Sequence, residues 1–371
     1  MKPIKVLTVF GTRPEAIKMC PVIKALEKEN RIQSVVCVTG QHREMLQNVL
    51  DIFDVRPDYS LRVMREGQHL SDLTARIITE TRAVFDAEKP DLALVHGDTT
   101  TTFSAALSAF YARVPVGHVE AGLRTESIAS PFPEELNRRL TSRIAILHFA
   151  PTEKNARNLR DEGITENVFV TGNTAIDALR YTVDDGYRFS AEAVRRLDFS
   201  ERIVTVTAHR RENWGAPLEN ICRALLALSG THRDLRFVFP MHPNPVVRDT
   251  VVPLLSGNPR FLLIEPLDTR DMHNLMKRSY LILTDSGGLQ EEAPALGVPT
   301  VVLREETERG EAVESGTVVL AGTTKEGIVA QAERLISDEE ARRRMIETVS
   351  PYGDGFASER IVEGIMGYFA G

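Results

Sequence analysis

The sequence is poor in the features that mark secreted, metal-binding and membrane proteins. It has three cysteines, Cys20, Cys37 and Cys222, which lie far apart and lack the spacing of metal ligands. Such usage is typical of buried thiols in a reducing compartment. No run of about 18 apolar residues occurs, and the first apolar run, Val6 to Phe10, is too short for a signal peptide. We therefore expect a cytoplasmic protein that does not associate with a membrane.

Excess positive charge and cofactor fingerprints are also missing. The formal net charge is −7, so nothing at whole-chain level favours nucleic acid as a partner. The chain lacks the G-x-G-x-x-G fingerprint of dinucleotide-binding folds, none of its tyrosines is followed four residues later by lysine, and it has no Asp-x-Asp metal motif. We therefore expect neither a redox cofactor nor a bound metal.

Short apolar runs alternate with segments of helical period along the whole chain. This alternation predicts an α/β fold in which helices cover both faces of a parallel sheet. Strands are expected first at Ile4–Phe10, Ser34–Thr39, Leu92–His96, Val114–Val119, Ala145–Ala150 and Val168–Thr171, with helices near 15–29, 42–53, 70–87, 103–112, 134–143 and 152–162. A second series of strands is expected at Ile203–Thr207, Leu235–Phe239, Phe261–Ile264, Leu281–Thr284, Thr300–Leu303 and Thr317–Leu320.

The restart of the pattern predicts two domains, and 371 residues are enough for two separate cores. We expect two Rossmann-like, doubly wound lobes at residues 1–175 and 190–356. The polar, weakly patterned stretch Tyr181 to Ser200 suggests a linker, which we place near residues 172–190. A last helix at 357–371 could cross back to the first lobe, which periodicity alone does not decide.

The stretch Leu281 to Pro294, LILTDSGGLQEEAP, is the most informative part of the chain. A strand is followed by Ser286, Gly287 and Gly288, and then by a helix over Leu289 to Leu296. This arrangement can hold a phosphate, because backbone N–H groups and the helix dipole favour an anion at a helix N-terminus. Glu292 falls about one turn further on, where it can accept hydrogen bonds from a sugar diol. The alternative is a tight turn with a good N-cap.

Turns that follow the other strands also carry charged and histidine side chains. In doubly wound folds ligands bind outside the carboxyl ends of the strands, so these turns are expected to share one edge. The acidic residues in these turns have structural alternatives. Asp98 could cap a helix, Glu120 could pair with Arg124, and Glu134 could simply interact favourably with the dipole of the helix that it begins. The remaining candidates at these turns are Arg13, Lys18, His209, Arg210 and His242.

Nine ordered blocks together resemble one family, the non-hydrolysing UDP-N-acetylglucosamine 2-epimerases. They are GTRPEAIKM, HGDTTTT, GHVEAGLRT, PFPEELNRR, TGNTAIDAL, TAHRREN, LTDSGGLQEEAP, TERGEAVESGT and PYGDG. The resemblance covers residues 4 to 367. The resemblance implies two lobes of the glycosyltransferase-B type, with the nucleotide sugar in the central cleft. It implies that the enzyme interconverts UDP-N-acetylglucosamine and UDP-N-acetylmannosamine for cell-surface polysaccharide synthesis. It also implies that the enzyme needs no cofactor and is a homodimer.

The resemblance also implies roles for individual residues. The proton-transfer and leaving-group residues are Asp98, Glu120, Glu134 and His209. The substrate-binding residues are Arg13, Lys18, Leu267, Met272, Ser286, Gly287, Gly288, Glu292 and Arg309. An allosteric effector site, where UDP-N-acetylglucosamine itself binds, is formed by Gln41, His42, Gln68, Arg210 and His242. The sequence departs from regulated relatives at Glu44 and Gly67, and Met272 stands where an aromatic residue is common.

The implied chemistry avoids a direct deprotonation of C2, which no neighbouring carbonyl acidifies. Anti elimination of UDP gives 2-acetamidoglucal, and re-addition of UDP with protonation on the other face gives the epimer. Which carboxylate removes the C2 proton is left open. A glycosyltransferase, a hydrolysing epimerase and a non-enzymatic nucleotide-sugar sensor are competing interpretations of the same motifs.

Overall fold

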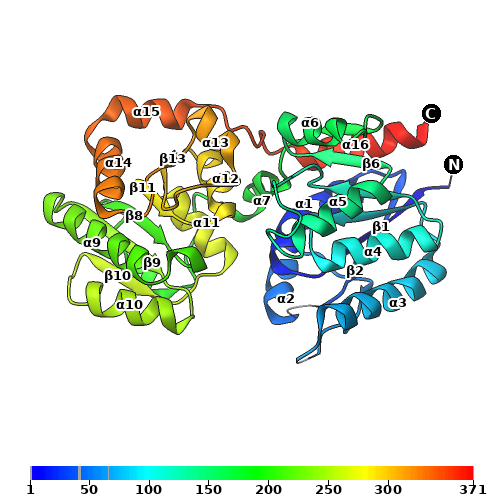
Figure 1. The fold of residues 1–371 in the computed structure, drawn as a ribbon, viewed down its shortest axis with the longest axis horizontal. Coiled ribbons are helices and arrows are strands. Elements are labelled where there is room, and N and C mark those ends of the chain that lie inside the picture. Colours follow the sequence, from blue (N-terminus) through cyan, green and yellow to red (C-terminus); the bar gives the residue numbers. More distant parts are fainter. Residues whose placement is uncertain (1, 41–42, 66, 371) are drawn as a thin grey trace. The chain divides into compact units, whose positions relative to one another are not determined.

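The computed structural model describes residues 2–40, 43–65 and 67–370, and the chain divides into two compact units. The first unit is Met1–Tyr181 with Tyr352–Gly371, and the second is Thr182–Pro351 (Figure 1). The chain returns to the first unit at Tyr352, whose carbonyl accepts a 2.8 Å hydrogen bond from the N–H of Asn173. The C-terminal helix α16 (Ala357–Ala370) then packs on α1 (Arg13–Lys28) within the first unit.

The first unit contains a seven-stranded parallel sheet with the order β3-β2-β1-β4-β5-β6-β7. The strands are nearly continuous apolar runs, as expected for a sheet that is buried on both faces. Their bounds are β1 Ile4–Phe10, β2 Ile32–Val38, β3 Tyr59–Ser60, β4 Leu92–His96, β5 Val116–Val119, β6 Leu147–Ala150 and β7 Val168–Val170. The sequence pattern did not predict β3, which has only two residues and therefore shows no period.

Helices cover both faces of this sheet, and each face has its own core. On one face, α1, α2 (Arg43–Ile52) and α16 pack over side chains such as Phe10 and Phe149. On the other face, α3 (Leu70–Glu88) and α4 (Thr100–Tyr111) pack over side chains such as Val95. The remaining helices are α5 Glu134–Ile144, α6 Glu153–Asp161 and α7 Thr174–Thr182.

The second unit contains a six-stranded parallel sheet with the order β10-β9-β8-β11-β12-β13. The strands are β8 Arg202–Thr207, β9 Leu235–Pro240, β10 Phe261–Ile264, β11 Leu281–Thr284, β12 Thr300–Val302 and β13 Val319–Leu320. The helices are α8 Glu192–Arg195, the 3-10 helix η1 Arg211–Asn213, α9 Ala216–Thr231, α10 Pro245–Leu255, α11 Thr269–Lys277, α12 Gly287–Ala295, α13 Gly310–Ser315, α14 Lys325–Ser337 and α15 Glu339–Glu347.

Much of the segment expected to be a linker belongs to the core of the second unit. Phe189 and Val194 are buried in a cluster with Leu275 of α11. The carboxylate of Asp271 holds the segment in place, since it accepts hydrogen bonds from the Tyr187 hydroxyl at 2.8 Å and the Ala191 N–H at 2.7 Å. The polar composition of this stretch therefore reflects hydrogen bonding to α11 and not a solvated connection.

The strand orders determine where ligands can approach each unit. In the first sheet the order reverses between β1 and β4, and in the second it reverses between β8 and β11. Ligands of doubly wound sheets bind beside such a switch point, at the carboxyl ends of the strands. The turns that begin at Gly11, Gly97, Ala208 and Asp285 are therefore the first places to look for a site. Within the described part of the chain, no helix combines the length and apolar character needed to span a bilayer.

Candidate functional site

Glu15 ties together the turns that follow β1 and β4. One carboxylate oxygen accepts hydrogen bonds from the N–H groups of Gly11 at 3.0 Å and Thr12 at 2.7 Å, and the other accepts from the Thr99 hydroxyl at 2.8 Å. Thr12 and Thr99 are in turn the N-caps of α1 and α4. The interpretation of Asp98 as a helix cap is therefore wrong, because the neighbouring Thr99 caps α4 and leaves the Asp98 carboxylate to another role.

Asp98 is positioned by α5. The side-chain amide of Asn137 donates to the Asp98 carbonyl at 2.9 Å, and Arg138 donates to the Asp98 carboxylate. Burial raises the pKa of Asp98, and although Arg138 opposes the shift, the charges of Glu120 and Glu134 add to it. A raised pKa makes this carboxylate a better proton acceptor than an ordinary aspartate.

Glu120 lies directly after β5 in a backbone conformation that side chains rarely adopt. Its φ is +61°, which costs about 1–3 kcal/mol for a non-glycine residue and is found mainly where function requires it. Lys18 donates to its carboxylate, and Nε2 of the buried His96 lies 3.5 Å away. The alternative pairing with Arg124 is wrong, because Arg124 forms a two-pronged ion pair with Glu162 at 2.7 and 2.9 Å.

The environment of Glu120 keeps it ionised. Burial raises its pKa, but the charges of Lys18 and His96 and the hydrogen bond from Lys18 outweigh burial and hold the pKa well below the usual range. Asp98 and Glu120 therefore follow neighbouring strands with pKa values displaced in opposite directions. Two carboxylates that differ in this way can divide proton transfer and charge stabilisation between them.

Two adjacent glutamates begin α5 and have different surroundings. Glu135 is fully buried and pairs with Arg139 at 2.6 Å and Arg138 at 3.3 Å, so it is part of the scaffold. Glu134 forms no hydrogen bond or ion pair with any residue that the structure describes. It is available to a ligand at the N-terminus of the helix. Arg13, the first residue of α1, is partly buried.

In the second unit, two guanidinium groups lie against the start of α12. A Cβ atom added to Gly287 would stand 3.1 Å from Cζ of Arg309 and 3.2 Å from Nη2 of Arg210. Ser286 is the N-cap residue, but its hydroxyl makes no capping hydrogen bond to the helix. Because the helix N-terminus also carries partial positive charge, the three features together favour a bound anion such as a diphosphate.

Glu308 is the internal counter-ion of this cationic cluster. Its carboxylate accepts from Arg309 at 2.8 Å and from Arg304 at 2.6 Å, and it lies 3.5 Å from Arg210. Burial raises the pKa of Glu308, but Arg309 and Arg304 outweigh it and the pKa falls to about 2. Glu308 therefore remains negative, and a bound anion competes with it for the same guanidinium groups.

His209 is oriented by Asp285, a residue that the sequence analysis did not single out. One oxygen of the fully buried Asp285 carboxylate lies 3.1 Å from Nδ1 of His209. The other accepts from the backbone N–H groups of His209 at 2.7 Å and Arg210 at 2.9 Å, and from Nδ2 of Asn213 at 3.0 Å. The available signal was an acidic residue at the end of a buried strand, directly before Ser-Gly-Gly.

The imidazole rings of His209 and His242 stack, with centroids 5.6 Å apart and planes inclined by 11°. Burial lowers the pKa of His242, and the neighbouring charge of His209 adds to that shift. The lowered pKa favours the neutral form of His242 at neutral pH.

The carboxylate of Glu292, a residue of α12, lies next to a buried histidine. Nε2 of His273 lies 3.5 Å from the Glu292 carboxylate, and its Nδ1 is 2.7 Å from the hydroxyl of Thr182. Met272, on α11, is partly buried, and Leu267 is partly buried against the core cluster that contains Phe189.

The predicted effector residues are distributed over both units. Gln41 and His42 lie outside the described residues. Gln68 is in the first unit, where its side-chain oxygen accepts from the Arg65 N–H at 3.1 Å and from Arg76 at 3.0 Å. Arg210 and His242 belong to the second unit, as described above. Among residues 2–40, 43–65 and 67–370, no group of three or more acidic, histidine or cysteine side chains could hold a metal ion.

Comparison with known proteins decides the family. A family profile described as UDP-N-acetylglucosamine 2-epimerase matches residues 24–366. The chain belongs to this UDP-N-acetylglucosamine 2-epimerase family. The Bacillus subtilis protein of that name is 50% identical over 370 residues, which span 100% of this chain and 97% of the relative. The family resemblance drawn from the nine blocks is therefore confirmed, and the chain is an enzyme of this class.

Solved structures of similar proteins have the same fold. The Neisseria meningitidis enzyme bound to UDP-GlcNAc matches with a TM-score of 0.89 and 47% identity, over 98% of this chain and 100% of that one. The S. aureus MnaA–UDP co-structure matches with a TM-score of 0.88 and 52% identity, over 100% of this chain and 97% of that one. The predicted fold class, with two doubly wound parallel α/β lobes, is therefore confirmed.

Proposed function

We propose that the protein interconverts UDP-N-acetylglucosamine and UDP-N-acetylmannosamine without releasing the free sugar. The observation that carries this proposal is the contrast between Asp98 and Glu120, two carboxylates that follow neighbouring strands with oppositely displaced pKa values. Ligands named for the Neisseria and S. aureus structures, UDP-GlcNAc and UDP, support a nucleotide-sugar substrate.

The reaction begins with cleavage of the bond between C1 and the diphosphate oxygen. The bonding electrons leave with UDP, and the sugar ring gains oxocarbenium character that makes the C2 proton acidic. Transfer of this proton to a carboxylate completes an anti elimination to 2-acetamidoglucal. UDP then adds back at C1 while a proton is delivered to the other face of C2, so that atoms and charges balance and no redox step is needed.

The carboxylates of the first unit have distinct tasks in this scheme. Asp98, with its raised pKa, takes the C2 proton. Glu120, held ionised by Lys18, stabilises the positive charge on the ring. Glu134, at the N-terminus of α5, supplies the proton to the opposite face when UDP returns.

The second unit holds the leaving group. Ser286, Gly287 and Gly288 bind the diphosphate at the start of α12, together with Arg309. His209, oriented by Asp285, donates to the departing phosphate oxygen, which lowers the basicity of the leaving group. Glu292 binds the ribose diol, while Leu267 and Met272 contact uracil.

We further propose that UDP-N-acetylglucosamine also acts as an effector through Gln41, His42, Gln68, Arg210 and His242. The stacking of His242 on His209 supports a link between effector and leaving group. The product serves as a precursor of cell-surface polysaccharide, and the enzyme functions as a homodimer. If UDP-N-acetylmannosamine is turned over equally well with and without UDP-N-acetylglucosamine, the effector role is wrong.

The test of the reaction is incubation of the purified chain with UDP-N-acetylglucosamine in D2O, followed by proton NMR. The expected product is UDP-N-acetylmannosamine carrying deuterium at C2, because the proton taken by the carboxylate exchanges with solvent. Free N-acetylmannosamine with UDP would instead assign a hydrolysing epimerase. Recovery of unchanged, undeuterated substrate would contradict the proposal and favour a glycosyltransferase or a sensor.

A further inference from the structure

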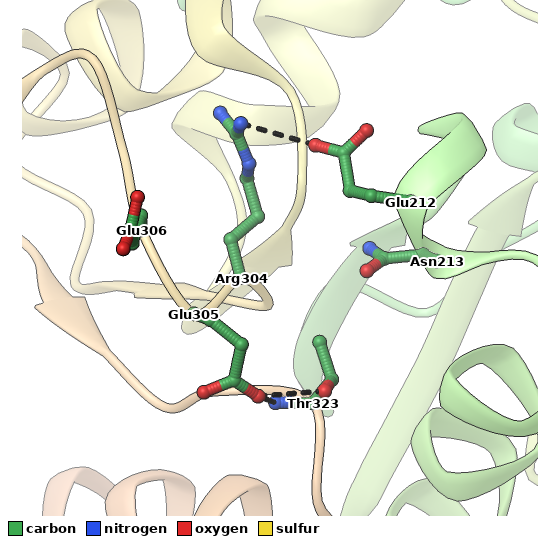
Figure 2. A pocket seen from close by; sticks show the side chains of 6 residues that line it. All are labelled: Glu212, Asn213, Arg304, Glu305, Glu306 and Thr323. Atoms are coloured by element: carbon green, nitrogen blue, oxygen red, sulfur yellow. Dashed lines mark hydrogen bonds and ion pairs between the residues drawn. The ribbon is translucent and has the colours of Figure 1, made fainter.

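A polar pocket opens in the second unit, and its lining residues are separate from those assigned to the substrate. It has a volume of about 450 Å³ and lies among η1, the segment after β12 and the segment after β13 (Figure 2). Its lining carries three carboxylates and one guanidinium group, so the lining has an excess of negative charge. The lining residues are Glu212, Asn213, Arg304, Glu305, Glu306 and Thr323.

The decisive feature of this pocket is Asn213, which is 1% exposed and whose Oδ1 has no hydrogen-bond partner in the described structure. The orientation of the amide is fixed, because Nδ2 donates to two pure acceptors, Oδ2 of Asp285 at 3.0 Å and the carbonyl of Leu303 at 3.0 Å. The unpaired atom is therefore an acceptor, and the side chain points into the pocket (Figure 2). A buried acceptor without a partner is unfavourable, so a ligand that supplies an N–H donor is stabilised here.

The carboxylates around Asn213 define the charge of that donor. Glu212 pairs with Arg304 at 3.0 Å, and Glu305 accepts from the N–H and hydroxyl of Thr323 at 2.8 and 2.7 Å. Glu306 makes no ion pair or hydrogen bond with a described residue. The charge of Arg304 compensates that of Glu212. The carboxylates of Glu305 and Glu306 therefore leave two uncompensated negative charges at the pocket.

We propose that this pocket binds an organic ammonium ion, such as a primary amine of an alkyl diamine. An ammonium group carries a positive charge and three N–H donors, which suit a pocket whose lining has an unpaired amide oxygen and an excess of carboxylates. A metal ion is the poorer match, because no cluster of three acidic, histidine or cysteine side chains in the described chain could coordinate one. The volume of the pocket also exceeds that of a single ion and accommodates an alkyl chain.

The pocket is connected to the anion site by two hydrogen-bonded paths. Asn213 bonds to Asp285, which orients His209. Arg304 shares the Glu308 carboxylate with Arg309. An amine bound to Asn213 therefore contacts a hydrogen-bond partner of Asp285, the residue that orients His209. We expect binding of the amine to change the affinity for UDP. This coupling rests on the proposed function of His209, whereas the binding of the amine does not.

The test is calorimetric titration of the full chain with 1,4-diaminobutane, compared with MgCl2 and with NaCl at equal ionic strength. The single tryptophan, Trp214, follows Asn213 directly and gives a second readout by fluorescence. The double variant Glu305→Gln with Glu306→Gln should weaken diamine binding at least about ten-fold. The matched control, Glu339→Gln with Glu340→Gln, removes two exposed charges from α15 and should leave binding unchanged.

Each outcome bears on the proposal. Saturable diamine binding that is lost in the pocket variant, but kept in the control, supports it. Absence of binding to the wild-type chain, or equal binding in both double variants, overturns it. Tighter binding of Mg²⁺ than of the diamine overturns the choice of ligand. Thermal unfolding of both variants, followed by circular dichroism, verifies that loss of binding is not loss of fold. Because these readouts do not use turnover, they remain valid if the proposed function fails.

Discussion

The buried carboxylate of Asp285 contacts His209 twice, through Nδ1 of the imidazole at 3.1 Å and through the backbone N–H at 2.7 Å. These contacts fix both the position of the residue and the direction of its ring. With Nδ1 facing Asp285, only Nε2 is available to a ligand. A histidine held in this way can donate to a phosphate oxygen without first being reoriented, which is the property required of the leaving-group side of the reaction.

Replacing Asp285 by Asn should therefore lower turnover by roughly ten-fold or more, the scale of impaired acid–base assistance. An amide cannot accept at both ends, so the donors now bound to Asp285 lose partners, and we expect the free energy of unfolding to fall by about 2 kcal/mol. Steady-state kinetics and denaturant unfolding measure the two effects. The control Asp234→Asn removes an exposed ion pair with Arg202 and should change neither. Turnover equal to wild type in Asp285→Asn would remove the orienting role.

Replacing Glu120 by Gln should leave UDP binding largely intact and lower turnover by roughly 100-fold, the scale of a lost charge-stabilising group. Binding of UDP is followed by calorimetry, and turnover by NMR. The matched control is Glu162→Gln, which removes a partly buried carboxylate paired with Arg124 in the same unit. If both variants lost activity equally, general disturbance of the first unit would explain the result, and Glu120 would not belong to the mechanism.

Replacing Glu308 by Gln should destabilise the unliganded protein, because Arg210, Arg304 and Arg309 lose their shared counter-ion. The folded-state pKa of Glu308, about 2, lies below its ordinary value, so its contribution is complete at neutral pH and is lost as the pH falls toward 2. The difference in unfolding free energy between wild type and variant should therefore be roughly 2–3 kcal/mol at pH 7 and shrink on acidification below about pH 4.5.

The same variant should respond more strongly to UDP, because the diphosphate no longer competes with an internal carboxylate. The shift of the melting temperature on saturation with UDP is the measurement, with Glu314→Gln on the exposed side of α13 as control. A UDP-induced shift smaller than that of wild type would show that Glu308 positions the arginines more than it neutralises them.

The sequence predicted the strands of both sheets because buried parallel strands appear as apolar runs. That ligands bind at the edge where polar turns follow the strands stays a prediction. The sequence did not predict β3, which is too short to show a period. It also missed Asp285 and Glu15, since each acts through several backbone N–H groups that only the folded turns bring together. The partners of Glu120 were missed for the same reason: Lys18 lies 102 residues away, whereas local spacing favoured Arg124.

The adjacent glycines at the start of α12 provide a matched test of the diphosphate site. In Gly287→Ala the new methyl group would lie 3.1 Å from Cζ of Arg309 and 3.2 Å from Nη2 of Arg210, so both guanidinium groups must move. In Gly288→Ala the nearest atom, Oε1 of Glu292, is at an ordinary 3.9 Å. Alanine favours a helix more than glycine does by about 1 kcal/mol, so neither change should destabilise the fold.

We therefore expect Gly287→Ala to weaken UDP binding at least about ten-fold, because it displaces the Arg309 guanidinium that binds the diphosphate and the Arg210 guanidinium next to it, while Gly288→Ala binds UDP within a few-fold of wild type. Calorimetric titration with UDP measures both affinities, and thermal unfolding confirms that the two variants are equally folded. Loss of affinity in Gly288→Ala alone would mean that the diphosphate approaches the second glycine and that Arg210 and Arg309 serve the scaffold. Equal affinity in all three proteins would place the diphosphate away from the N-terminus of α12 altogether.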